Sequence, residues 1–269
     1  VGVGLIGGSI GLEIKKRRLA AKVIGIARHK KTLQIAKKRG AIDRAGLNLD
    51  VVKDADLVIL AAPVGAIIKL ASRMGKILKQ GCIVSDVGST KLAVVKRMER
   101  TLPKGINFVG AHPLAGGERR GISNAKLGLF KGSLCILTKS RKTDLQSLNK
   151  VKEFWRILGS RVWVTSPKNH DKILSFVSHL PHIGAFSLVN AVPAKYLKFS
   201  SSGFKDTTRI ALSDEEVWKD IFVTNREQIM GAVRVFQDEI KRFKAGLKSS
   251  DEAALSNFIR RAKLKRMGI

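Results

Sequence analysis

The sequence predicts an α/β fold in which a doubly wound, mostly parallel sheet is followed by an all-helical C-terminal region. Three observations lead to this prediction. The chain opens with Gly2, Gly4 and Gly7 in the spacing G-x-G-x-x-G. From there to residue 164, short apolar runs alternate with helical patterns, and after Pro167 only helical patterns remain. We therefore expect a Rossmann-like first half.

The opening glycine turn has the spacing that binds the pyrophosphate of a dinucleotide. Gly2 would let the chain leave a strand sharply, Gly4 would let the backbone approach the pyrophosphate, and Gly7 would let the next helix pack close to the sheet. A helical pattern and a second apolar run follow, which completes the start of a βαβ unit. The expected cofactor contacts in this turn come from Gly2, Gly4, Leu5, Ile6 and Gly7.

The chain begins at this turn and has no initiator Met. Since an ordinary strand has about five residues, we expect about five N-terminal residues to be absent from the sequence. These residues would form most of the first and central strand of the sheet.

The alternation of strands and helices continues in order along the first half. Apolar strand runs are expected at residues 23–26, 57–62, 83–84, 108–109, 133–137 and 161–164. Helices are expected at residues 31–39, 66–78, 91–102 and 144–158, with Gly40 ending the first and Gly81 following the second. Because the strand runs are apolar throughout, we expect helices to cover both faces of the sheet.

The second half changes character near Ser166 and Pro167. Helices are expected at residues 170–192, 218–242 and 250–265, and a polar loop is expected at residues 200–208. We therefore divide the chain into a dinucleotide-binding domain, residues 1–166, and a helical domain, residues 167–269, for substrate binding and dimerisation.

Composition narrows the class of protein. The 269 residues suffice for two domains, and no apolar run approaches the length of a membrane span. The cysteines, Cys82 and Cys135, lie in apolar runs, which predicts free buried thiols and a cytoplasmic protein.

The net charge of +30 is high enough to suggest nucleic-acid binding. The basic residues are spread along the whole chain, however, with little aromatic interleaving. We favour a basic surface that attracts an anionic substrate and a phosphorylated cofactor.

Polar residues follow three of the expected strands, where ligands bind in a doubly wound sheet. They lie at Ala62–Pro63, at residues 86–91 and at residues 112–118. His112 could be the base for a substrate hydroxyl or could cap a backbone carbonyl. Ser89 could orient that hydroxyl or be a helix N-cap. Glu118 could be an acid near the site or a solvated loop charge.

The helical half holds further candidates. His179 and His182 flank Pro181, which should break the helix; with no cluster of acidic or Cys ligands nearby, they predict hydrogen-bonding or core histidines and no metal site. Arg209 could clamp a substrate carboxylate or pair with Asp206 three residues before it, and both can hold together.

The choice between NAD and NADP depends on the residues at the end of the second strand. An acid there would bind the ribose diol of NAD, but residues 25–31 contain none. Arg28, His29 and Lys30 suit a 2′-phosphate instead. The sequence therefore favours NADP slightly over NAD.

Five segments together resemble the prephenate/arogenate dehydrogenase family of tyrosine biosynthesis. They are residues 2–9, 86–91, 110–116 with Glu118, 178–182 and 202–209, in the order of the family. The resemblance implies oxidative decarboxylation of prephenate to 4-hydroxyphenylpyruvate, or of arogenate to tyrosine, with hydride transfer to NAD or NADP. It also implies a homodimer through the helical domain.

The resemblance also implies roles for individual residues. His112 matches the catalytic histidine that holds the ring hydroxyl, and Ser89 matches the serine that positions it. The implied substrate-binding residues are His182, Arg209, Glu118, Asp206, His179 and Trp218. Arg28, Ala62, Pro63 and Ser89 complete the expected cofactor-binding set.

Alternatives stay open at this point. Other two-domain Rossmann oxidoreductases, such as hydroxyacid dehydrogenases or imine reductases, share the sheet and helical layout. A basic nucleic-acid-binding protein is a further alternative. The sequence does not distinguish prephenate from arogenate, and it does not reveal feedback inhibition by tyrosine.

Overall fold

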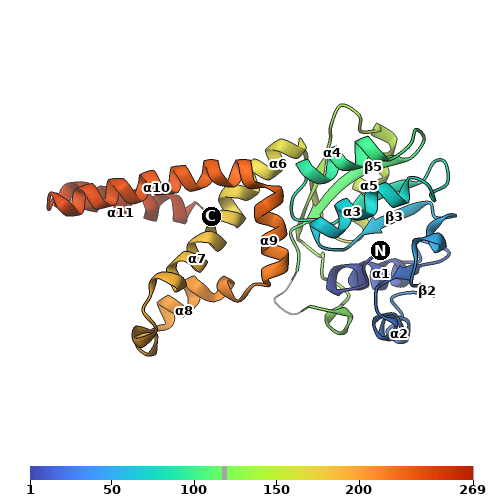
Figure 1. Ribbon diagram of the computed structural model, residues 1–269, viewed down its shortest axis with the longest axis horizontal. Coiled ribbons are helices and arrows are strands. Elements are labelled where there is room, and N and C mark those ends of the chain that lie inside the picture. The colour runs from blue at the N-terminus through green and yellow to red at the C-terminus, as the bar shows by residue number, and fades with distance from the viewer. Residues whose placement is uncertain (117–119, 269) are drawn as a thin grey trace.

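The computed structural model describes residues 1–116 and 120–268. Figure 1 shows a sheet layered with helices on one side of the molecule and a set of helices extending from it on the other. The last strand ends at Thr165 and the next helix begins at Pro167. The predicted fold class is confirmed, and the division into two domains stays a prediction.

The described strands form a five-stranded sheet and a separate two-stranded sheet. The strands are β1 (Ile24–Ile26), β2 (Arg44–Gly46), β3 (Leu57–Leu60), β4 (Ile83–Asp86), β5 (Asn107–Pro113), β6 (Leu134–Thr138) and β7 (Arg161–Thr165). The larger sheet has the order β3-β4-β5-β6-β7, and only its β5–β6 pair is antiparallel. The sequence did not predict β2, because this strand has only three residues, Arg-Ala-Gly, and two of them are exposed.

The start of the chain lies between the two sheets. The Ala61 N–H donates to the Val1 carbonyl at 2.7 Å, and the Gly2 N–H donates to the Ile26 carbonyl at 2.8 Å. Residues 1 and 2 therefore join β3 to β1, and they place the glycine turn beside the ends of both strands.

Helices cover both faces of the sheet, as predicted. They are α1 (Leu5–Arg17), α2 (Lys30–Lys38), α3 (Val64–Met74), α4 (Leu92–Thr101) and α5 (Leu145–Ile157), with short 3₁₀ turns at Leu49–Val52 and Ile122–Asn124. One buried apolar cluster contains Ile67 of α3 and Met98 of α4, and another contains Ile10 of α1 and Trp155 of α5. A core on each face fixes the strand ends that carry the polar residues.

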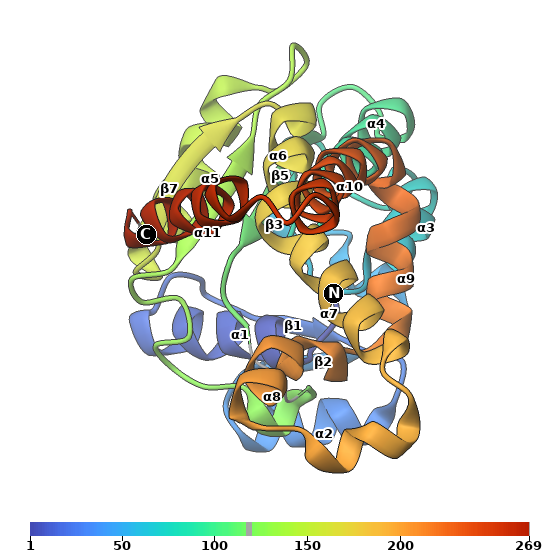
Figure 2. The ribbon, with the colours of Figure 1, turned by 90° about the vertical axis from the view of Figure 1, so that its left-hand side faces the viewer.

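The helical part contains irregular turns between its helices. Its elements are α6 (Pro167–Leu174), the π turn η3 (Ser175–His179), α7 (Leu180–Ala191), η4 (Ala194–Phe199), α8 (Ser202–Thr208), η5 (Arg209–Leu212), α9 (Glu215–Thr224), α10 (Arg226–Lys248) and α11 (Glu252–Met267). Helix α9 lies against the sheet part, whereas α10 and α11 form a hairpin that projects away from it (Figure 1). Figure 2 views the molecule from the side toward which this hairpin extends.

Two predictions of local structure in this part are wrong. Most of residues 200–208 form the helix α8 rather than a loop. Only Thr208 is buried within that helix, so the segment lacks the apolar periodicity by which a helix is recognised in a sequence. The single helix predicted at 218–242 is interrupted at Asn225, whose φ and ψ of −114° and 23° separate α9 from α10.

The predicted break at Pro181 is also wrong. The chain stays helical from Pro167 to Ala191, and the π turn at Ser175–His179 immediately precedes the proline. Proline lacks an N–H and its ring clashes with the carbonyl four residues earlier in a regular α-helix. A wider turn relieves this clash, so the helix continues.

This continuous helix, residues 167–191, is long and apolar enough to cross a membrane by length and composition alone. The expectation that no segment approaches that length is therefore corrected. Its buried polar side chains, His170, Asp171 and His179, face the rest of the chain. Only 22% of its most apolar stretch is buried, which leaves most of that surface available to another molecule.

Candidate active site

The predicted strand-end residues share one edge of the fold. β3, β4 and β5 run parallel, so their carboxyl ends meet at the same edge. Ala62 and Pro63 directly follow β3, Ser89 follows β4, and His112 is the penultimate residue of β5. The glycine turn reaches this edge through the hydrogen bond between Val1 and Ala61.

The glycine turn has the geometry that its spacing predicts. Gly2 has a φ of +90°, and a Cβ there would lie 2.2 Å from the Ala61 carbonyl oxygen. A Cβ on Gly7 would lie 2.0 Å from the Gly2 carbonyl oxygen. A Cβ on Gly4 would meet no described atom within 4 Å, and no side chain of the described residues caps α1. An open backbone at an uncapped helix N-terminus fits the pyrophosphate of a dinucleotide.

The residues predicted to choose the cofactor follow β1. Arg28, His29 and Lys30 are exposed, and His29 stands at the N-cap position of α2 without a side-chain cap bond. The three side chains are therefore accessible to an anionic group at this strand end.

A buried ion pair holds the segment that carries Ser89. Asp86 and Lys91 are fully buried, and the Lys91 ammonium bonds Asp86 Oδ2. Asp86 Oδ2 also accepts from the Gly88 N–H at 2.9 Å, and Oδ1 accepts from the Ala111 N–H at 3.1 Å. One carboxylate thus fixes the half-buried Ser89 loop to the residue before His112.

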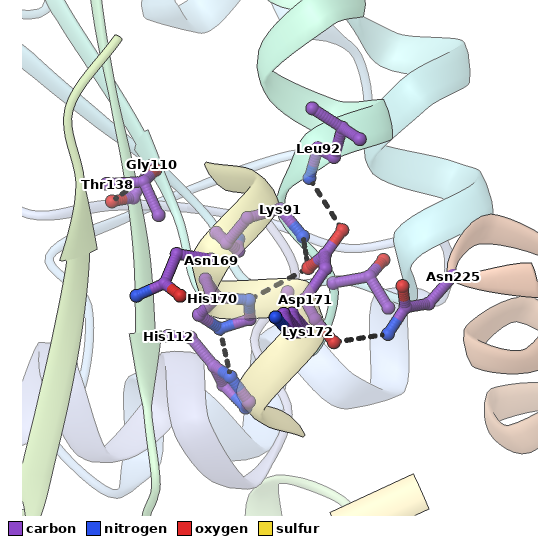
Figure 3. Close-up of polar contacts among 12 residues, drawn as sticks. Lys91, Leu92, Gly110, His112, Thr138, Asn169, His170, Asp171, Lys172 and Asn225 are labelled. Atoms are coloured by element: carbon purple, nitrogen blue, oxygen red, sulfur yellow. Dashed lines mark hydrogen bonds and ion pairs between the residues drawn. The ribbon is translucent and has the colours of Figure 1, made fainter. Parts of the chain in front are cut away.

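His112 does not act alone in the structure (Figure 3). Its Nδ1 lies 2.9 Å from Nε2 of His170, and His170 Nδ1 lies 2.8 Å from Asp171 Oδ1. The Asp171 carboxylate also accepts the backbone N–H groups of Lys91 at 2.7 Å and Leu92 at 2.9 Å. A helix of the second half thereby contacts two strand ends of the first half.

The local sequence explains why these two residues face the sheet. Ser166 caps α6 by accepting the Asn169 N–H at 3.1 Å, and Pro167 occupies the first turn, where its missing N–H costs nothing. His170 and Asp171 then come at the end of the first helical turn, and both are buried. The Asp171 carboxylate is well placed to accept hydrogen bonds from the N–H groups at the start of α4.

Burial keeps the histidines of the site neutral. Desolvation lowers the pKa of His112 well below its ordinary value, and the nearby His170, Lys91 and His179 lower it further. Desolvation also lowers the pKa of His170, although the hydrogen bond to Asp171 opposes this, and it lowers the pKa of His179 to about 4. Neutral imidazoles can accept as well as donate protons near pH 7.

Asn225 links a second group of predicted residues to this centre. Its Nδ2 donates to the Asp171 carbonyl at 2.8 Å and lies 3.1 Å from His179 Nδ1. His179 packs edge-on against Trp218, and His182 stacks on the same indole with ring centroids 3.6 Å apart. His179 Nε2 is buried and has no hydrogen-bond partner among the described residues.

Arg209 and Asp206 lie elsewhere. They line an open cavity of about 470 Å³ whose other lining residues come from α7, α8 and η5, namely Val189, Lys205, Thr208, Ala211 and Leu212. No residue of the strand edge lines it within the described chain. A common substrate for Arg209 and His112, which the family resemblance implies, stays a prediction, and Glu118 lies outside the described residues.

Within residues 1–116 and 120–268, no group of three or more His, Cys, Asp and Glu side chains is arranged to hold a metal ion.

Comparisons with known proteins identify the family. Residues 10–164 match the family model for the nucleotide-binding domain of prephenate dehydrogenase, and residues 166–261 match the model for its dimerization domain. The prephenate dehydrogenase of Bacillus subtilis is 35% identical over all of this chain and 74% of the relative. The chain belongs to the prephenate dehydrogenase family.

Other members of the prephenate dehydrogenase family and its solved structures agree. The cyclohexadienyl dehydrogenase of Zymomonas mobilis is 31% identical over 82% of this chain and 77% of the relative. The crystal structure of prephenate dehydrogenase from A. aeolicus, in complex with hydroxyphenyl propionate and NAD+, is 34% identical. It covers 99% of this chain and 96% of that one, with a TM-score of 0.93. The predicted family resemblance is confirmed.

Sequence reasoning missed His170, Asp171 and Asn225. An adjacent His and Asp after a Ser-Pro helix start was a usable signal, because the chain has only five histidines. Asn225 gave no signal, since an asparagine within a helical pattern is common on solvated faces.

Proposed function

We propose that the protein oxidises and decarboxylates prephenate, or arogenate, with hydride transfer to NAD(P)+ in tyrosine biosynthesis. The observation that carries this proposal is the neutral His112 at the end of β5. Its Nδ1 is engaged by His170, which leaves Nε2 to accept the proton of a ring hydroxyl. The glycine turn lies at the same edge of the fold.

The reaction mainly requires the protein to orient the substrate and the cofactor. A bound nicotinamide supplies the hydride acceptor. His112 Nε2 takes the hydroxyl proton as the carbinol carbon loses hydride, while Ser89 helps hold that hydroxyl. The bond to the ring carboxylate breaks, carbon dioxide leaves and the ring becomes aromatic. Because aromatisation drives the reaction forward, positioning and charge placement do most of the catalysis.

The helical part binds the rest of the substrate in this proposal. Arg209, supported by Asp206, pairs with the side-chain carboxylate, since guanidinium and carboxylate form two parallel hydrogen bonds. The stacked pair of His182 and Trp218 lines the site, and His179 offers its unpartnered Nε2–H. The family resemblance adds Glu118, which lies outside the described residues, to the proposed set.

For the cofactor, we propose a preference for NADP over NAD. The exposed Arg28 and Lys30 can neutralise a 2′-phosphate, and residues 25–31 contain no acid for a ribose diol. Arg28→Ala should weaken NADP binding more than NAD binding. Equal effects on both would argue against the phosphate contact.

We also propose a cytoplasmic homodimer with no membrane or nucleic-acid partner. Exposed apolar side chains gather on the helical part, at Phe176, Val177, Leu188, Met230, Val235, Phe236, Ile240 and Leu247. An apolar area of this kind is typical of an interface. Neither Cys82 nor Cys135 forms a disulfide in the described structure, which supports a reducing compartment. Light scattering after gel filtration tests the dimer.

The test of the activity is an assay of reduced nicotinamide formation with each of the four pairs of substrate and cofactor. Turnover with prephenate or arogenate is expected, with carbon dioxide released in equal amounts. Cofactor binding without turnover of either substrate would contradict the proposal. The assay then extends to 2-hydroxy acids and cyclic imines, which the other two-domain oxidoreductases would use.

A further inference from the structure

The pair His170–Asp171 is buried, titratable and joined to the proposed catalytic base (Figure 3). It lies on α6, whereas His112 lies on β5. The chain Asp171 Oδ1, His170 Nδ1, His170 Nε2 and His112 Nδ1 is connected by distances of 2.8 and 2.9 Å. Both distances are those of well-formed hydrogen bonds.

The direction of these hydrogen bonds follows from groups that can only donate. Backbone N–H groups of Lys91 and Leu92 bond the two oxygens of Asp171, so its carboxylate is an acceptor. His170 must therefore carry its proton on Nδ1, and a neutral His170 has its lone pair on Nε2. His112 then donates from Nδ1, which leaves its own lone pair on Nε2.

Nearby charges favour a proton on His170 over one on His112, because Asp171 and Asp86 act to raise the pKa of His170, whereas His170, Lys91 and His179 lower that of His112. The charged and titratable groups around the His112–His170 pair are Asp86 and Lys91 from the β4–α4 segment, Asp171 from α6, and His179 from the π turn. With neutral histidines, two carboxylates and one ammonium leave this buried group with a net negative charge. A proton that reaches His170 compensates this negative charge.

We propose that His170 and Asp171 are positioning residues that hold His112 in the tautomer with a basic Nε2. This inference rests on the proposed function. When His112 Nε2 takes the substrate proton, the Nδ1 proton can pass to His170 Nε2 while His170 Nδ1 stays bonded to Asp171. The positive charge then lies beside a carboxylate, and the number of protons in the site rises only by the one taken from the substrate.

Asp171 also links the two proposed catalytic side chains. Its carboxylate bonds the backbone of Lys91 and Leu92, two and three residues after Ser89. The same group therefore sets the position of the serine loop and the tautomer of His112. Since α6 belongs to the helical part, packing of that part against the sheet assembles the base.

Three variants and a matched control test this role. His170→Phe keeps a ring but removes the acceptor, and we expect kcat to fall by about 100-fold, the lower end of what general base catalysis contributes, with little change in KM. His170→Gln offers an oxygen to His112 Nδ1–H and should recover much of that loss. Asp171→Asn presents an amide that favours the reversed tautomer, so it should lose at least as much as His170→Phe. Lys172→Gln, an exposed neighbour on α6, should keep wild-type turnover.

The pH profile separates positioning from a general structural effect. His112 acts as a base, so kcat rises with pH through its pKa. Removing the acceptor of the His112 Nδ1–H should change the pH of that rise in His170→Phe but not in Lys172→Gln. Unchanged turnover and an unchanged profile in folded His170→Phe would overturn the proposal.

The tautomer itself can be observed without turnover. Nitrogen-15 NMR of histidine-labelled protein, with His112→Asn used to assign the signal, should show His112 protonated on Nδ1 at neutral pH. Protonation on Nε2 would overturn the inference even in an active enzyme. If neither substrate is oxidised by the wild type, the proposed function fails while this measurement still decides the hydrogen-bond direction.

Discussion

The sheet part and the helical part position their functional side chains in different ways. In the sheet part, Ser89 and His112 lie just after β4 and at the end of β5, where a buried apolar run stops. In the helical part, His179 lies in a π turn and Trp218 lies on the helix that ends at Asn225. Strand ends are readable from sequence, whereas irregular helical turns depend on what packs around them.

The two parts also use different stabilising contacts. The sheet part relies on a fully buried ion pair between Asp86 and Lys91. The helical part relies on hydrogen bonds of the neutral Asn225 amide. Polar contacts also join the two parts: Thr224 bonds Thr90 at 2.8 Å, and Asp220 accepts the Gly65 N–H at 2.8 Å.

The largest expected effect is on the sheet side, at His112. His112→Asn removes the proposed base and should lower kcat by about 10²- to 10⁴-fold, the usual contribution of general base catalysis. Fluorescence titration should show cofactor binding retained, because the glycine turn is untouched. Wild-type turnover in this variant would remove His112 from the mechanism.

The next effect concerns the buried ion pair. Asp86→Asn should lower the free energy of unfolding by about 3–5 kcal/mol, since it leaves the Lys91 ammonium buried without a counter-charge. Denaturant unfolding measures this loss. The double variant Asp86→Asn, Lys91→Met should be less destabilised than the single one, and a larger loss in the double variant would contradict this explanation.

A smaller effect is expected on the helical side. Asn225→Ala leaves the buried Asp171 carbonyl and His179 Nδ1 without their donor, and each unsatisfied group costs about 1–3 kcal/mol. Asn257→Ala, on the exposed surface of α11, is the matched control and should have little effect. Equal stabilities for the two variants would show that the hydrogen bonds of Asn225 contribute little to the free energy of unfolding.

The smallest expected effect concerns how the pH changes the free energy of unfolding. The pKa of His179 is about 4 in the folded chain and about 6.5 when unfolded. Between these values the unfolded chain binds the extra proton, so stability falls as the pH falls, by at most about 1.4 kcal/mol per pH unit for this group. Unfolding at pH 7, 6 and 5 should show this slope, and His179→Gln should reduce it. A slope unchanged by that variant would assign the acid sensitivity to other groups.

Much of the sheet part could be predicted from the sequence. Pro63 after an apolar run and His112 before Pro113 indicated strand ends. The spacing of Gly2, Gly4 and Gly7 indicated the turn. These signals are local, because glycine and proline restrict or free the backbone at their own positions. The short strand β2 was not predicted, because its sequence has no apolar pattern.

The helical part was less predictable for a physical reason. Pro181 signals a helix break, but the π turn before it absorbs the clash and keeps the helix continuous. Asn225 sits in a helical pattern, yet its hydrogen bonds to α6 and to His179 accompany a break there. Both outcomes depend on contacts between residues far apart along the chain.

The sequence by itself determined the α/β fold class, the glycine turn and the candidate base His112. Those features follow from the apolar period and from the backbone preferences of single residues. Only the tertiary structure decided that His170 and Asp171 reach that base and that Asn225 ties His179 to the same centre. His112 and His170 are 58 residues apart, and His179 and Asn225 are 46 residues apart. No local sequence pattern marks such pairs, because only folding brings them together.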